Sequence, residues 1–317
     1  MNQHQETAPD EVAQVIANYT PRGIDLYHWL SIRDFVQQAV AESEPPTADE
    51  ARRRMTLVSA LAEWVGYGAC FPVERRTVFD LDLMGEFIDT GNDWTPKVRR
   101  MAQGRLKTLA QRLNPDWPAD LPEESAYSSA WDPQPYSAAE TVALRAWADS
   151  QDTAERRASA QVLLALLLGA GLHSHEVLAL RVRDIEVDDA GVLLRVRGQR
   201  ARAVPVRSDY EQMLIELLTD APGEQYVFAP EQSSRRSGLV PAFVAQSNPQ
   251  PGLRPTARRL RATWVVAHIT AGVPAPILVR AAGLTNLRPY ERWLYTLPEY
   301  EQDAYRQALR KHTKDAP

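Results

Sequence analysis

The spacing of hydrophobic residues along the chain predicts a mostly helical protein. Apolar side chains recur every three or four positions, the helical period, in four segments of the first half: residues 24–40, 55–65, 79–88 and 96–113. Thr95 and Pro96 suit the cap and the first position of the last of these helices. Between residues 185 and 206 apolar residues alternate instead, which predicts a β-hairpin connected through residues 197–202.

A proline-rich segment divides this pattern into two parts. Residues 114–135 contain five prolines among polar residues, which is typical of a domain boundary. Ser137 and Glu140 then form a capping-box pattern that opens a new helix. We therefore expect an acidic N-terminal extension with a helix, a helical domain, a linker and a second domain, over residues 1–48, 49–114, 115–135 and 136–317.

The net charge of −5 hides a gradient along the 317 residues. Residues 1–50 carry 9 acids and 2 bases, whereas residues 251–317 carry 11 bases and 5 acids. Five arginines and no acid lie between Arg195 and Arg207. Phosphate binding depends on local basic surface rather than on total charge, so the acidic average does not exclude a nucleic-acid partner.

The composition also bears on where the protein works. The single cysteine, Cys70, excludes an internal disulfide and a cysteine-based zinc cluster, which favours a reducing compartment. The first residues lack a signal pattern. No apolar run approaches the roughly 18 residues that cross a bilayer. We therefore expect a soluble cytoplasmic protein without a membrane partner.

Residues 169–184 predict the end of a buried helix, a glycine break and a second helix that carries Glu176. This stretch resembles the segment of tyrosine recombinases, the phage integrase family, that reads Thr-Gly-Leu-Arg-x-x-Glu-x-x-x-Leu. His173 stands where the resemblance places the first catalytic arginine. The group of His173, His175 and Glu176 also suggests a metal site. An i, i+2 spacing puts the two rings on different faces of a helix, so we expect neither a metal nor a cofactor.

The predicted hairpin resembles the family's Val-x-Gly-Lys-Gly-x-Lys-x-Arg-x-Val-Pro segment, with two residues fewer. The resemblance implies that the first lysine of this segment enters the minor groove and protonates the leaving oxygen. Gln199 stands at that position and cannot act as an acid, and arginine is a poor proton donor. We expect Arg197, Arg200 and Arg202 of this hairpin to contact DNA.

Residues 255–264 resemble the family's His-x-Leu-Arg-His-Thr box, in which a histidine and an arginine stabilise the phosphate. Arg261 matches the arginine, and Arg258 replaces the histidine. Together with Arg259 they lie within one turn, which indicates either an ordinary basic helix start or a phosphate contact. The flanking pattern favours the phosphate contact.

Residues 282–295 resemble the family's Leu-Gly-His segment, which the nucleophilic tyrosine follows nine residues later. Leu284 replaces the histidine, and Trp293 stands at the position of the nucleophile. Tyr295 comes two residues later and Tyr290 three residues earlier, and two residues turn a helical side chain by about 200°. Of six catalytic positions that the resemblance implies, only Arg261 keeps the family residue, so we do not expect ordinary strand cleavage.

The resemblance covers residues 50–300 and implies a fold. That fold is a mainly α-helical, two-domain clamp, in which a helical core-binding domain is followed by a catalytic-type domain with a small antiparallel sheet. The last helix of the first domain is its most basic element. We expect it to lie along phosphates through Arg99, Arg100 and Lys107.

Three functions fit these observations. The leading hypothesis is a catalytically degenerate recombinase-like protein that binds duplex DNA without cutting it, as a regulator or an accessory factor of a mobile element. In that hypothesis Arg258, Arg259 and Arg261 form an open cationic cradle for phosphate. The second is an active site-specific recombinase that uses a displaced tyrosine, Tyr295 or Tyr290. The third is a protein-interaction module whose C-terminal helix, within residues 297–311, joins a homo-oligomer or an active recombinase.

Overall fold

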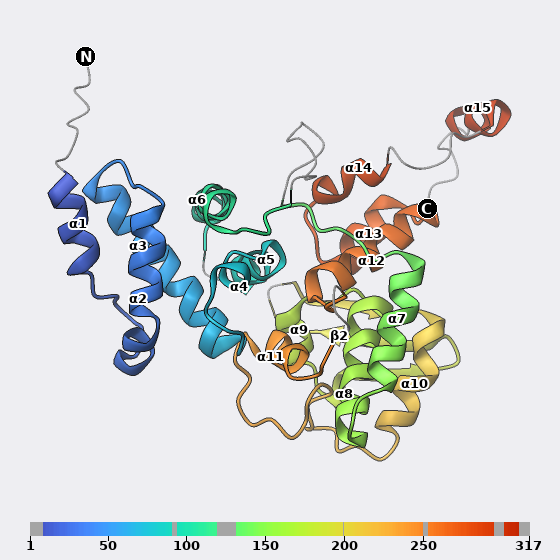
Figure 1. Cartoon of the computed structure of the whole chain (residues 1–317). Helices are drawn as coiled ribbons and strands as arrows, with labels where there is room; N and C mark the ends of the chain where they lie inside the picture. Colours follow the sequence, from blue (N-terminus) through green and yellow to red (C-terminus); the bar gives the residue numbers. More distant parts are fainter. Residues whose placement is uncertain are drawn as a thin grey trace.

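The computed structural model describes residues 9–90, 94–118, 131–198, 200–249, 253–294 and 301–310. These residues form a mainly helical protein with one three-stranded antiparallel sheet, as the sequence pattern predicted (Figure 1). Gln199 and Tyr295, two of the predicted site residues, lie outside the described residues.

The first half of the chain is a helical bundle. Its elements are α1 (Pro9–Ala17), α2 (Leu26–Glu42), α3 (Ala48–Glu63), the π-helical turn η1 (Trp64–Gly68), α4 (Arg75–Val78), α5 (Leu81–Thr90) and α6 (Pro96–Leu113). In Figure 1, α1, α2 and α3 lie side by side, and α4, α5 and α6 lie between them and the second half of the chain.

Capping side chains explain where these helices begin. Thr95 accepts a hydrogen bond from the backbone N–H of Val98 at 3.3 Å, and the predicted helix over residues 96–113 is confirmed as α6. The predicted helix over residues 79–88 corresponds to α5, which begins two residues later, and the short helix α4 precedes it. Asp80 accepts a hydrogen bond from the N–H of Leu83 at 2.9 Å, which starts α5 after a break.

One apolar core holds the first half together, and it includes the N-terminal helices. Trp29, Ile32 and Val36 of α2 are buried in the same cluster as Met55 and Leu61 of α3. The sequence pattern set residues 1–48 apart as an extension. In the structure, the helices of this segment contribute side chains to the core of the first half, because the apolar face of α2 packs on α3.

The second half contains the sheet and the remaining helices. Its elements are α7 (Ala138–Asp149), α8 (Ala154–Leu164), the π-helical turn η2 (Ala165–Gly169), α9 (Ser174–Ala179), the 3-10 turn η3 (Val182–Asp184), β1 (Ile185–Asp188), β2 (Gly191–Val196), β3 (Arg202–Pro205), α10 (Ser208–Leu218), α11 (Leu239–Ala245), α12 (Ala257–Thr270), α13 (Ala275–Ala282), the 3-10 turn η4 (Arg288–Tyr290), α14 (Glu291–Leu294) and α15 (Gln302–Arg310). The capping box of Ser137 and Glu140 opens α7 as predicted.

The sheet confirms the predicted hairpin and adds a strand to it. β2 pairs with β3 in antiparallel register, with Val196 opposite Arg202, and β1 pairs with the other edge of β2. Alternate side chains of the hairpin, Val192, Leu194 and Val204, are buried in the core of the second half. The chain between Val196 and Arg202 connects β2 to β3.

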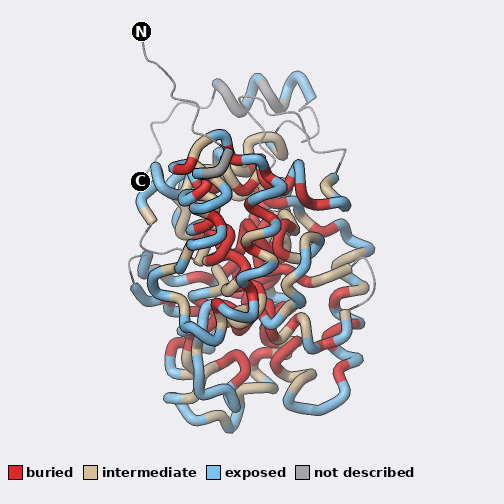
Figure 2. Tube along the Cα trace, turned by 60° about the vertical axis from the view of Figure 1, so that its left-hand side comes forward, coloured by how far each residue is buried: buried red, intermediate tan, exposed pale blue. Residues whose placement is uncertain are grey.

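The two cores meet where α5 contacts α12. Figure 2 shows buried segments running through the interior of both halves, with exposed segments around them. A candidate site that draws residues from both halves lies at this junction. Among the described residues, no helix is both long enough and apolar enough to cross a membrane.

Candidate phosphate-binding site

A pocket of about 330 Å³ lies at the junction of the two halves; we call it the central pocket. Five of the predicted site residues line it: His173, Arg258, Arg261, Leu284 and Tyr290. They come from the loop before α9, from α12, from the loop after α13 and from η4. The fold therefore brings together motifs that are more than 100 residues apart in the chain.

Arg261 is the best-buried cation of this pocket, with 4% of its surface exposed. Its guanidinium donates hydrogen bonds to the carbonyl oxygens of Gly171 and Ala282. Burial lowers the pKa of Arg261, although Tyr290 and Glu176 oppose that shift. Arg261 thus ties the turn after η2 to the end of α13, and it does so through neutral acceptors.

His173, at the position of the first catalytic arginine, is a neutral group. Burial lowers the pKa of His173 well below its ordinary value, and the positive charge of Arg261 acts in the same direction. Its Nε2 is buried without a hydrogen-bond partner in the part of the chain that the structure describes. A neutral imidazole can exchange a hydrogen bond with a phosphate oxygen, but it does not supply the charge of an arginine.

The two histidines do not point to different faces, as their spacing suggested. The rings of His173 and His175 stack, with centroids 5.3 Å apart and an interplanar angle of 19°. The expectation was wrong because α9 begins at Ser174, so that His173 has the extended backbone of a cap residue. No group of three potential metal ligands occurs among the described residues.

Glu176 and Arg202 form a buried ion pair beside the pocket. Arg202 Nη1 and Nη2 lie 2.5 and 2.9 Å from the two carboxylate oxygens of Glu176. Both side chains are almost fully buried, at 4% and 5% exposure. Burial acts to raise the pKa of Glu176, but the hydrogen bonds and the charge of Arg202 outweigh it, and the pKa lies below its ordinary value. This pair anchors the hairpin to α9.

Arg258 reaches across to the first half of the chain. Its Nε lies 3.3 Å from Oδ2 of Asp89 on α5, and its Nη2 donates to the carbonyl oxygen of Trp131. Only 14% of the Arg258 side chain is exposed. The cation that replaces the family's histidine is therefore already matched by a carboxylate of the same chain.

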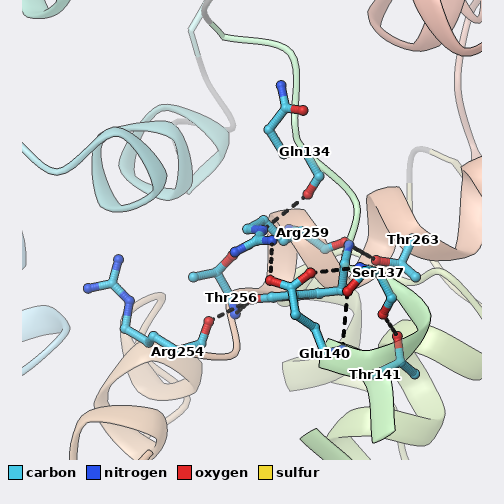
Figure 3. Close-up of polar contacts among 9 residues, drawn as sticks. Gln134, Ser137, Glu140, Thr141, Arg254, Thr256, Arg259 and Thr263 are labelled. Atoms are coloured by element: carbon cyan, nitrogen blue, oxygen red, sulfur yellow. Dashed lines mark hydrogen bonds and ion pairs between the residues drawn. The ribbon is translucent and has the colours of Figure 1, made fainter. Parts of the chain in front are cut away.

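Arg259 belongs to a separate cluster that joins α12 to the start of α7. Its Nη2 lies 3.1 Å from Oε1 of Glu140, and its Nε donates to the carbonyl oxygen of Gln134 (Figure 3). Its guanidinium also lies over the ring of Tyr136, 3.9 Å from the ring centroid. Burial raises the pKa of Tyr136 to about 12. Its hydroxyl remains protonated and donates to the carbonyl oxygen of Arg254.

These contacts correct the expectation of an open cationic cradle. Arg261 donates to carbonyl groups, Arg258 pairs with Asp89, and Arg259 pairs with Glu140. The three guanidinium groups share one helix start, but they point to three different sets of partners. The sequence could not show these ion pairs and hydrogen bonds, because the groups that bind the three arginines belong to elements distant in the chain.

The central pocket has an acidic side that was not predicted from the sequence. Glu86 and Asp89 of α5 line it together with Thr90 and with Gln103 of α6. Glu86 is 5% exposed and accepts a hydrogen bond from the N–H of Ala257, the first residue of α12, at 2.9 Å. A signal was present, since Asp82, Glu86 and Asp89 follow at i, i+4 and i+7 and so share one face of the helix.

Glu86 should make folding stability depend on pH. Burial raises its pKa to about 7 from an ordinary value of 4.5, against the opposing charge of Arg254. The folded state therefore holds this proton more tightly than the unfolded state. Stability from Glu86 is complete below pH 4.5 and is lost as the pH rises to 7, by about 3 kcal/mol in total.

The variant Glu86→Gln carries no such proton, which makes it the test. We expect its free energy of unfolding, relative to the parent protein, to rise by about 3 kcal/mol between pH 4 and pH 8. Denaturant titrations over this range measure the difference. Asp34→Asn, at a side chain that is 89% exposed on α2, is the matched control. A difference between Glu86→Gln and the parent that stays constant with pH would contradict the assignment.

Tyr290 is the described tyrosine nearest to the position of a nucleophile. It is 4% exposed and lines the central pocket with Arg258 and Arg261. Burial raises the pKa of Tyr290, and the charge of Arg261 only partly offsets this effect. Leu284 faces the same pocket, while Trp293 packs half-buried against the core of the second half. Among the described residues, the family positions thus offer arginines, but no lysine and no charged histidine. The phenol of Tyr290 lines the pocket from three residues before the position of the nucleophile.

The three expected phosphate contacts of α6 differ in their exposure to solvent. Arg99 lies 3.7 Å from Asp89, at the edge of the central pocket. Arg100 is exposed and lines an open groove of about 570 Å³ with Arg288 of η4. Lys107 is half-buried two turns further along α6.

The predicted DNA contacts of the hairpin include two exposed arginines. Arg197 is 66% exposed beside Asp184. Arg200 is exposed and donates a hydrogen bond to the carbonyl oxygen of Gly283 at 2.6 Å.

Comparison with known proteins decides the family. The model of the phage integrase family matches residues 138–296, which is half of the chain. The chain belongs to the phage integrase family. This confirms the resemblance to tyrosine recombinases that the four motifs of the second half indicated. The matched range begins at α7 and includes the central pocket's contributions from α9, α12 and η4.

Two curated relatives align with about half of this chain. Tyrosine recombinase XerC of Methylobacterium sp. (strain 4-46) is 39% identical over 153 residues, which cover 47% of this chain and 41% of the relative. Tyrosine recombinase XerA of Pyrococcus horikoshii is 24% identical over 157 residues, which cover 47% of this chain and 54% of the relative. The chain thus matches about half of the length of these relatives.

Solved structures of recombinases align along most of the chain. The pre-cleavage complex of the XerH site-specific recombinase bound to its difH substrate is 14% identical, with a TM-score of 0.46 and coverage of 95% of this chain and 94% of that one. The crystal structure of XerA recombinase is 15% identical, with a TM-score of 0.41 and coverage of 97% and 99%.

Proposed function

We propose that this protein binds duplex DNA through a tyrosine-recombinase scaffold and does not cleave it. Family membership supports a DNA partner, because the relatives are named as tyrosine recombinases. A role as a regulator or an accessory factor, for example of a mobile element, follows if binding occurs without strand cleavage.

One observation carries the proposal that cleavage is lost. Four of the six aligned family positions line the central pocket, and two of these four are Leu284 and an uncharged His173. Attack on a phosphate needs cations around the equatorial oxygens and a proton donor for the leaving oxygen. Each lost electrostatic partner typically lowers the rate by a factor of about 100 to 1000. Binding requires far less of the site than catalysis does.

A second candidate function is supported by the position of Tyr290. This tyrosine lines the pocket beside two arginines, so strand cleavage by a displaced nucleophile deserves a direct test. Its raised pKa opposes the idea, because a phenol that holds its proton tightly is a weaker nucleophile. Tyr295 lies outside the described residues and remains the other candidate.

Participation of the C-terminal helix in an assembly remains a prediction. α15 stands apart from the other helices in Figure 1. Its described side chains, which include those of Asp303, Arg306 and Arg310, are exposed. Size measurement with and without residues 297–317 tests whether this helix joins a second copy or an active recombinase.

The exposed arginines give the binding proposal a quantitative test. Arg100, Arg197 and Arg200 are the predicted DNA contacts that solvent reaches most readily. A protein that neutralises phosphates releases counterions, so the logarithm of affinity falls with the logarithm of salt concentration. Replacing all three residues by alanine should lower that slope by about 3 and weaken binding to every duplex.

The control replaces three exposed arginines of α2 and α3 by alanine: Arg33, Arg52 and Arg53. It changes the net charge by the same amount, away from the junction of the two halves. Fluorescence anisotropy with a labelled duplex at several salt concentrations measures both slopes. Equal salt dependence of affinity for the two triple variants would contradict the assignment of Arg100, Arg197 and Arg200 as DNA contacts.

A further inference from the structure

The acidic face of α5, formed by Asp82, Glu86 and Asp89, lies against the start of α12. Glu86 is buried and Asp82 is partly buried. Burial raises the pKa of both carboxyl groups. Gly85 lies between them, and a Cβ atom there would overlap with the guanidinium of Arg258. The absence of a side chain at Gly85 therefore lets Arg258 lie directly on the backbone of α5.

Asp80, just before α5, and two carboxylates of α5 bind cationic and N–H groups that would otherwise suit a phosphate. Asp89 lies 3.3 Å from Nε of Arg258, and Asp80, at the start of α5, lies 2.6 Å from Nη2 of Arg254. Glu86 accepts the hydrogen bond of the first N–H of α12, a helix of 14 residues. A helix N-terminus combined with arginines is the arrangement that binds phosphate in many proteins.

The contact between α5 and α12 keeps the Glu86 carboxyl group in an environment that disfavours its ionised form. Its hydrogen bond from Ala257 and the charges of Arg254 and Arg258 do not compensate for burial, because its pKa is raised to about 7. Separation of α5 from α12 would return this carboxylate to water. An anion whose oxygens bind Arg258 and the N-terminus of α12 more strongly can therefore displace the acidic face from these groups.

We propose that the acidic face of α5 is an intramolecular competitor of the DNA backbone at Arg258 and the N-terminus of α12. This inference rests on the proposed function, since it assumes that phosphates bind at these groups. DNA then binds fully only after α5 has moved away from α12, and the described arrangement is a closed form of the protein.

The test removes the competing charges without changing side-chain shape. We expect Glu86→Gln with Asp89→Asn to raise the affinity for a labelled duplex by about tenfold, because Arg258 and the α12 N-terminus no longer release a carboxylate. Asp34→Asn with Asp49→Asn, at side chains that are 89% and 74% exposed, makes the same change in net charge elsewhere. The single variant Asp89→Asn, at a side chain that is 43% exposed, should give part of the gain with little risk to folding.

The outcomes separate the inference from the proposed function. A gain in affinity well above that of the control pair, or binding that appears only in the variant, supports competition. A parent protein that binds DNA, with a variant that gains no more than the control, overturns the competition and leaves DNA binding intact. Absence of binding by the parent and by every variant overturns both.

Discussion

Replacing Arg202 by alanine is expected to destabilise the protein by about 3–5 kcal/mol. The change leaves the carboxylate of Glu176 buried without its bidentate partner, at a position that is 5% exposed. An unpaired buried charge costs far more than the net gain from forming the pair. Denaturant unfolding of the parent and the variant at pH 7 measures the loss.

The chain supplies a matched control for this prediction. Arg195 and Glu186 form an arginine–glutamate pair with two contacts of 2.7 Å, but the two side chains are 52% and 49% exposed. Arg195→Ala should cost less than about 1 kcal/mol, because water solvates the remaining carboxylate. Similar losses for the two variants would show that burial does not set the strength of the Arg202 pair.

Replacing Gly171 by alanine is the second change with a large expected effect, a loss of about 3 kcal/mol. Gly171 has a φ of +59°, and a Cβ atom there would overlap with the ring of Trp264. Trp264 is 2% exposed and donates from Nε1 to the carbonyl oxygen of Gly169, so it has little room to move. The carbonyl oxygen of Gly171 also accepts from Arg261, and any shift would disturb the central pocket.

Gly272 separates backbone strain from the steric overlap at Gly171. Its φ is +73°, and nothing lies within 4 Å of the position that a Cβ would take. Gly272→Ala should therefore cost about 1 kcal/mol, through the left-handed backbone alone. Thermal unfolding of both variants makes the comparison. Equal losses would mean that the overlap with Trp264 relaxes freely, contrary to the close packing expected of this core.

Much of the fold followed from local signals in the sequence. Hydrophobic periodicity predicted the four helices α2, α3, α5 and α6, and the caps at Thr95 and Ser137 placed the starts of α6 and α7. The order of the motifs also predicted which residues meet, since His173, Arg258 and Arg261 line one pocket. These features depend on residues that are close in the chain or that belong to a shared scaffold.

The partners of the charged residues could not be predicted in the same way. Glu86 and Ala257 are 171 positions apart, and no local pattern links them. Whether Arg258 faces solvent or Asp89 depends on how the two halves pack. The relative orientation of the His173 and His175 rings was also mispredicted, because His173 precedes α9 and has an extended backbone.

One measurement tests the central claim, that the protein binds DNA without cutting it. A labelled duplex with a nick beside the cleavage position traps a tyrosine recombinase as a covalent adduct, because the released fragment diffuses away. We predict a shifted band on a native gel and no covalent adduct on a denaturing gel of the same samples. A covalent adduct that disappears in Tyr290→Phe or in Tyr295→Phe would contradict the account and identify an active recombinase.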